Sequence, residues 1–184
     1  IELGATAVAA PPGTFPRARA TVQGTLARHT ASIAFAGADL DVEATAHGGV
    51  REPRNAAGAV SWAWTGSVDT LENRGPWVLR LAAPATLEFA RDHVRIGAAH
   101  LDVADGNVEL GALVWDDGRI STRGAFSGVP VATVARLAGV QLPFVSTLTL
   151  AGDWSLAAAP RLNGSVTVRR ERGDIFFGAE TSID

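Results

Sequence analysis

The sequence predicts an all-β protein, built as an antiparallel meander with one apolar face and one short helix near 130–138. Apolar and polar residues alternate with a period of two through most of the chain, as they do in strands that bury one face. Turn residues recur roughly every 8–12 residues between these stretches, which is typical of a meander. With 47% hydrophobic residues and no evident domain boundary, we treat residues 1–184 as a single β-rich segment.

The first residues, 1–17, have the composition of a linker, because APPGTFPRA at 10–18 contains three prolines and a glycine. The chain begins at Ile1 without a basic leader sequence. We therefore interpret the chain as a segment of a longer protein whose ordered part follows a linker-like start.

The strands follow, each recognised by apolar residues that stand two positions apart. The first strong example is SWAWTGSV at 61–68, and similar stretches continue almost to the end of the chain. The candidate residues for one shared apolar face are Leu40, Val42, Trp62, Trp64, Val68, Trp77, Leu79, Leu81, Leu87, Phe89, Val94, Ile96, Leu101, Val103, Val108, Leu110, Leu148, Leu150, Trp154, Val166 and Val168.

Tight hairpins are predicted at Asp105-Gly106 and Asp117-Gly118, because glycine accepts the positive φ of a type I′ turn. A strand near 107–115 runs between them. A β-bulge at Gly97 or Gly111 would reverse the alternation after it, so the assignment of faces depends on those two positions.

A single helix is predicted in VPVATVARLAGV. Pro130 suits a first helical turn, Val131 and Val134 share a face with Ala135 and Leu137, and Gly139 ends the helix.

The tripeptide Arg172-Gly173-Asp174 is the motif that many cell-adhesion ligands display on a flexible loop. Here it follows a strand at 162–170 and precedes the apolar stretch DIFF. We interpret it as a polar turn in which Gly173 supplies backbone freedom.

Composition and motifs exclude several classes of function. The chain has no cysteine, and its net charge of −3 gives no electrostatic basis for binding nucleic acid. DVADGNVE at 102–109 lacks the spacing of a calcium-binding EF-hand loop, and the four histidines are scattered. No nucleophile elbow, phosphate-binding loop or other catalytic constellation is present. We expect no enzyme activity, no metal site and no cofactor.

Several short motifs carry a resemblance to a known family, in this order along the chain. They are Trp64-x-Gly66, the LEN-RG-W stretch at 71–77, Pro84-Ala85, Gly124 before the VPVATVARL helix, Gly152-Asp153-Trp154 and Arg170-x-x-Gly173-Asp174. From about Ala31 to its end, the chain resembles the middle part of the TamB family, a group of AsmA-like, bridge-like lipid transfer proteins.

The resemblance implies a U-shaped, taco-like sheet with an apolar inner face, in the periplasm of a Gram-negative bacterium. It implies a parent protein anchored in the inner membrane, which moves phospholipids to the outer membrane and cooperates with a barrel partner of the TamA type. The candidate apolar residues would then line a groove for phospholipid acyl chains.

Other interpretations stay open. An apolar face is ordinarily a closed core between two sheets or inside a barrel. The strand edges suit a scaffold or chaperone segment that pairs with strands of outer-membrane barrels or autotransporters, and they also suit self-association. A membrane barrel or adhesin passenger is a third class, disfavoured by the absence of tyrosine.

Overall fold

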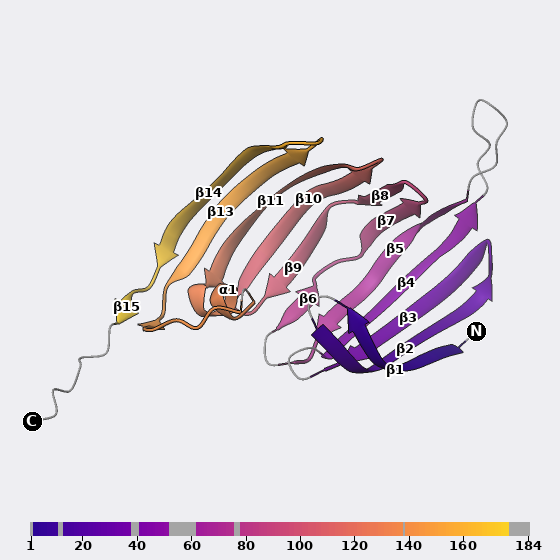
Figure 1. Ribbon diagram of the computed structural model, residues 1–184, viewed down its shortest axis with the longest axis horizontal. Coiled ribbons are helices and arrows are strands. Elements are labelled where there is room, and N and C mark those ends of the chain that lie inside the picture. The colour runs from indigo at the N-terminus through magenta and orange to yellow at the C-terminus, as the bar shows by residue number, and fades with distance from the viewer. Residues whose placement is uncertain are drawn as a thin grey trace, which may run out of the picture.

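The computed structural model describes residues 2–10, 13–37, 41–51, 62–75, 78–137 and 139–176, and its main feature is one large antiparallel sheet (Figure 1). The strands of this sheet are β1 (Glu2–Ala10), β2 (Gly13–Thr25), β3 (Arg28–Ala36), β4 (Asp41–Arg51), β5 (Ala63–Asn73), β6 (Leu79–Leu81), β7 (Ala85–Ala90), β8 (His93–Ile96), β9 (Ala99–Val103), β10 (Gly106–Asp116), β11 (Arg119–Pro130), β13 (Thr149–Ala158) and β14 (Leu162–Arg172). The predicted all-β meander is therefore confirmed.

The order of strands across the sheet follows the order along the chain. β1 and β14 are its two outermost strands, and Figure 1 shows the sheet as a long, curved ribbon of strands between them. Most connections are short, because antiparallel neighbours need only a tight turn between them; the β4–β5 and β11–β13 connections are longer.

Two positions in the middle of the sheet are each filled by two short strands. β5 pairs through its first half with β7 and through its last residues with β6. β10 pairs in the same way with β9 and then with β8. Residues 82–84 separate β6 from β7, and residues 97–98 separate β8 from β9. Pro84, which has no N–H, and Gly97 interrupt strand pairing at these two places.

Helix α1 (Val131–Leu137) follows β11, as the sequence predicted for 130–138. Gly139 has φ of 68°, and its N–H donates to the carbonyl of Arg136 at 3.0 Å, so a left-handed glycine ends the helix. Beyond it, β12 (Val145–Ser146) and β15 (Ile175–Phe176) form a small separate sheet. No helix in the described ranges is long and apolar enough to cross a membrane.

The linker-like start predicted for residues 1–17 needs correction, because β1 and the first part of β2 pair along most of that stretch. The prediction treated the prolines at 10–18 as a sign of a linker. Pro16 lies within β2, where an extended backbone accommodates its fixed φ and a missing N–H interrupts the ladder at one position only.

One of the two predicted hairpin turns is confirmed and the other is displaced. Asp117 and Gly118 have φ of 44° and 77°, as a type I′ turn requires. The turn between β9 and β10 consists of Ala104 and Asp105 instead, with Ala104 at φ of 52° and Gly106 already in the strand.

Candidate apolar binding face

Cross-strand register places most of the predicted apolar residues on the same face of the sheet. Trp64 of β5 lies opposite Phe89 of β7, which lies opposite Val94 of β8. Val94 lies opposite Trp115 of β10, which lies opposite Ile120 of β11. Directly opposite residues in a sheet share a face, so this row crosses five strands without a polar side chain.

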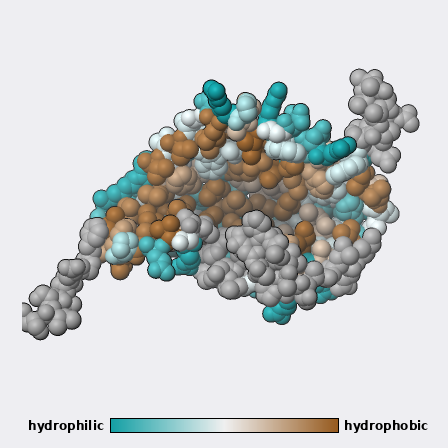
Figure 2. Space-filling model, in the orientation of Figure 1, coloured by the Kyte–Doolittle hydropathy of each residue, from teal (hydrophilic) through white to brown (hydrophobic). Residues whose placement is uncertain are grey.

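Parallel rows extend this surface, which we call the apolar face. Its predicted members are Val42, Trp64, Val68, Leu79, Leu81, Leu87, Phe89, Val94, Ile96, Leu101, Val103, Val108, Leu110, Leu150, Trp154, Val166 and Val168. Figure 2 shows hydrophobic residues gathered over the middle strands of the sheet.

Four predicted residues need separate mention. Trp62 stands just before β5, and its ring meets the Phe89 ring edge-on at a centroid distance of 5.9 Å. Leu148 lies before β13 and outside the ladder, where its carbonyl accepts the N–H of Val131 at 2.9 Å. Leu40 and Trp77 lie outside the described residues.

The apolar face also includes residues that the sequence analysis missed. Gly111 is the extra residue of a β-bulge, since Leu110 pairs with Gly124 while Ala112 pairs with Arg123. Simple alternation from Leu110 would therefore assign the wrong residues beyond the bulge. The missed members include Leu71, Leu113, Trp115, Phe126 and Leu156. The sequence analysis did name Gly111 as a possible bulge, and this glycine was the signal from which the change of face beyond Leu110 could have been predicted.

Aromatic rings occupy the space beside glycines on this face. A Cβ added at Gly48 or Gly66 would meet the ring of Trp64, and one added at Gly124 would meet the ring of Trp154. Trp64 also stacks on Phe89 at a centroid distance of 5.3 Å. Glycine therefore provides the space in which a large ring covers a neighbouring strand.

Two indole N–H groups on the apolar face, those of Trp64 and Trp154, donate to polar side chains. Trp64 Nε1 donates to His29 Nε2 at 2.8 Å, and His29 Nδ1 lies 3.1 Å from the carbonyl oxygen of Thr25. Trp154 Nε1 donates to Thr122 Oγ1 at 3.1 Å. His29 and Thr122 are therefore polar residues that accept a hydrogen bond from a tryptophan N–H on this face.

The opposite face of the sheet is polar. His47 pairs with Asp69 at 2.8 Å, Arg80 with Asp102 at 3.3 Å, and the Thr45 hydroxyl lies 2.6 Å from that of Thr70. These groups are partly or fully exposed, so they solvate this face rather than form a core.

The apolar face is incompletely covered. A compact folded protein of 19.0 kDa exposes about 8,400 Å², whereas this chain exposes 12,573 Å². Among the described residues, no large side chain is fully buried, and Val166 and Val168 on β14 are 58% and 56% exposed. A closed core between two packed sheets would bury such residues.

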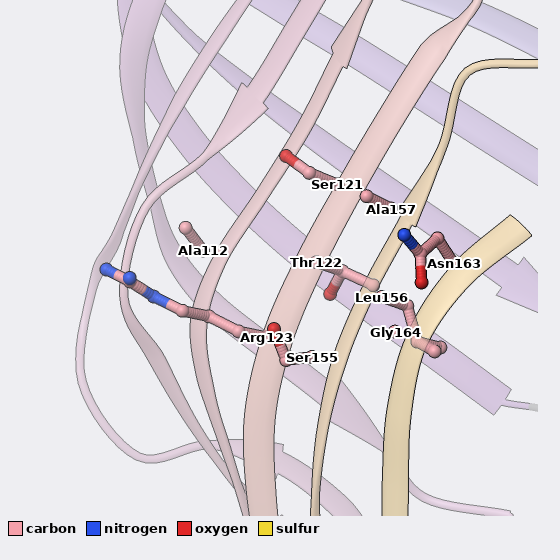
Figure 3. A pocket seen from close by; sticks show the side chains of 9 residues that line it. All are labelled: Ala112, Ser121, Thr122, Arg123, Ser155, Leu156, Ala157, Asn163 and Gly164. Carbon is pink, nitrogen blue, oxygen red and sulfur yellow. The ribbon is translucent and has the colours of Figure 1, made fainter.

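Polar residues do not converge on a catalytic or metal-binding arrangement. A hollow of about 410 Å³ between β11, β13 and β14 is lined by Ser121, Arg123, Ser155 and Asn163 among others. Figure 3 shows the guanidinium of Arg123 extending away from Asn163, so these groups do not surround a common point. Within the described ranges, no three His, Asp or Glu side chains are grouped to hold a metal ion.

The Arg172-Gly173-Asp174 tripeptide forms a bend that is fixed by β14 at its first residue and by hydrogen bonds at Asp174. Arg172 is the last residue of β14, which extends two residues further than the strand expected at 162–170. Gly173 has φ of 85°, the N–H of Asp174 donates to Thr147 Oγ1 at 3.1 Å, and the Asp174 carboxylate pairs with Arg170 at 2.7 Å.

Comparison of the chain with protein-family models, with curated proteins and with solved structures gave no match.

Proposed function

We propose that the apolar face is the inner face of a groove that shields phospholipid acyl chains during transport between the inner and outer membranes. The observation that carries the proposal is the continuous apolar register from β4 to β14, on a sheet that exposes far more surface than a compact protein of its mass. The resemblance to the TamB family supplies the setting: the periplasm, a membrane-anchored parent and a barrel partner of the TamA type.

The physical basis is the hydrophobic effect. Each acyl methylene removed from water contributes roughly 0.8 kcal/mol, so contact along a few strands is sufficient without a specific polar site. Such a groove would accept acyl chains of different kinds. The hydroxyl of Thr122 and the imidazole of His29 already bond to tryptophans, so they add little unsatisfied polarity to the groove.

A second candidate is a scaffold that pairs with strands of outer-membrane proteins. The observation in its favour is β14, an outermost strand of the sheet in which every residue is exposed. An unprotected strand edge can add a further strand through backbone hydrogen bonds.

The test is mass spectrometry of solvent-extracted lipid from the freshly purified, folded chain. We expect phospholipid to be present, and we expect Leu156→Asp to lower its amount several-fold. Leu156 lies on the apolar face opposite Thr122 and Gly164, where a carboxylate would oppose acyl chains.

Ser155→Asp is the matched control, because it introduces the same side chain one residue away on the polar face. Ser155 lies opposite Arg123, which would compensate the new charge. A folded chain without lipid would contradict the groove and leave strand pairing as the favoured function. Equal lipid loss in both variants would contradict the assignment of faces.

A further inference from the structure

We infer that one long edge of the sheet is a docking surface for a phospholipid membrane that contains anionic lipids. This edge, which we call the hairpin rim, comprises the β2–β3, β7–β8, β10–β11 and β13–β14 turns together with the end of β4 and the start of β5. Figure 1 shows these connections along the upper and right-hand edges of the molecule. The inference goes beyond the proposed function, because a groove can shield acyl chains without docking along its side.

The hairpin rim carries exposed apolar side chains at several neighbouring positions. Leu26 in the β2–β3 turn is 69% exposed, and Leu162 at the start of β14 is 73% exposed. Trp62 and Ile120 are 48% and 40% exposed. Exposed apolar residues at neighbouring tips mark an interaction surface, and tryptophan in particular favours the boundary between headgroups and acyl chains.

The same rim carries an excess of positive charge. Its exposed arginines are Arg28, Arg51, Arg91, Arg119 and Arg161, and its acidic residues are Asp92, Asp116 and Asp117. The side chains of these five arginines form no ion pair or hydrogen bond with any residue that the structure describes. The whole chain has a net charge of −3, so this basic surface is local.

The combination favours an anionic membrane as the occupant of the rim. Guanidinium groups beside exposed leucine and tryptophan match the phosphates and the acyl boundary of an anionic bilayer surface. The apolar face also reaches this rim, because Ile120 continues the row of Trp115 and lies opposite Ala158. A bilayer at the hairpin rim would therefore adjoin the apolar face directly.

The experiment is flotation of the folded chain with vesicles of phosphatidylcholine, alone or mixed with phosphatidylglycerol. We expect binding to the mixed vesicles, decreasing as salt is raised. Leu26→Asp should lower vesicle affinity about tenfold, since it removes an inserted side chain and adds repulsion. Each of Arg91→Gln and Arg161→Gln should lower it about fivefold.

Val78→Asp and Val145→Asp are the controls. Both valines are exposed, at 54% and 71%, but neither lies on the hairpin rim. We expect these variants to float like the unsubstituted chain. Flotation that is unaffected by the rim substitutions, or reduced equally by the controls, would overturn the inference, and so would failure of the unsubstituted chain to bind mixed vesicles.

A second readout locates the contact. Brominated phospholipids quench tryptophan fluorescence at the depth of their bromines. We expect Trp62→Phe to remove most of the quenching and Trp154→Phe to leave it. The reverse result would contradict docking through the rim.

Co-purified lipid, measured on the Leu26→Asp and arginine variants, separates this inference from the proposed function. Leu26 lies in a turn outside the apolar face, so its replacement should leave groove-bound lipid unchanged. A lipid-free chain that still floats would contradict the groove alone, and a lipid-loaded chain that does not float would contradict the rim alone.

Discussion

Trp64 shows how a single large residue is fixed on an otherwise apolar surface. It is only 6% exposed, its ring covers Gly48 and Gly66, and its N–H donates to His29. The hydrogen bond also determines which tautomer His29 adopts, because Nε2 can accept only when it carries no proton. His29 therefore donates through Nδ1 to the Thr25 carbonyl and accepts from Trp64.

Replacing His29 should show how much the Trp64–His29 hydrogen bond contributes to the free energy of unfolding. His29→Phe keeps an aromatic ring but removes the acceptor, leaving a buried indole N–H unsatisfied. We expect the free energy of unfolding to fall by about 1–3 kcal/mol, measured by denaturant titration.

The comparison variant is His100→Phe, on the polar face. His100 Nε2 lies 3.9 Å from Glu109 and both side chains are more than half exposed, so its loss should cost less than about 0.5 kcal/mol. Equal effects of the two substitutions would mean that Trp64 does not depend on His29.

At the level of the turns, two hairpins with the same length make different use of glycine. Asp117-Gly118 places glycine at φ of 77°, whereas the β9–β10 turn holds Ala104 at φ of 52°. A left-handed backbone costs an alanine about 1–2 kcal/mol. The β9–β10 turn is therefore the less favourable of the two.

Exchanging these residues should have opposite effects on stability. Ala104→Gly should raise the free energy of unfolding by up to about 1 kcal/mol, after the greater unfolded-state freedom of glycine is offset. Gly118→Ala should lower it by about 1 kcal/mol through backbone strain alone, because an added Cβ would have no atom within 4 Å. Thermal and denaturant unfolding measure both, and changes of the same sign would contradict the turn assignments.

The strands themselves show how far the sequence determines the fold. Alternation predicted most of the residues that share a face from Trp64 to Leu110, because that signal is local, but it missed Leu71 after a register shift between β4 and β5. It failed beyond Gly111, where a bulge depends on the neighbouring strand, and at residues 1–17, where cross-strand pairing outweighs the prolines. A sequence pattern also cannot show whether an apolar face is covered, since coverage depends on elements distant in the chain.

At the scale of the whole molecule, the large exposed area has a thermodynamic consequence. An unfolded chain of this mass exposes about 27,500 Å², so folding to 12,573 Å² buries only a little over half of it. The heat-capacity change on unfolding of the lipid-free chain should therefore be about a fifth smaller than for a compact protein of equal length. Differential scanning calorimetry measures it, and a full-sized change would show that the apolar face is covered.

The neighbour-by-neighbour strand order has a consequence for how the molecule acquires its structure. Every strand of the large sheet pairs only with strands that are close to it in the chain, so the contact order is low for an all-β protein. Formation of one hairpin leaves an edge on which the next can form, and only the β4–β5 and β11–β13 connections require a longer loop to close. Such a chain can fold progressively from one end as it emerges from a ribosome.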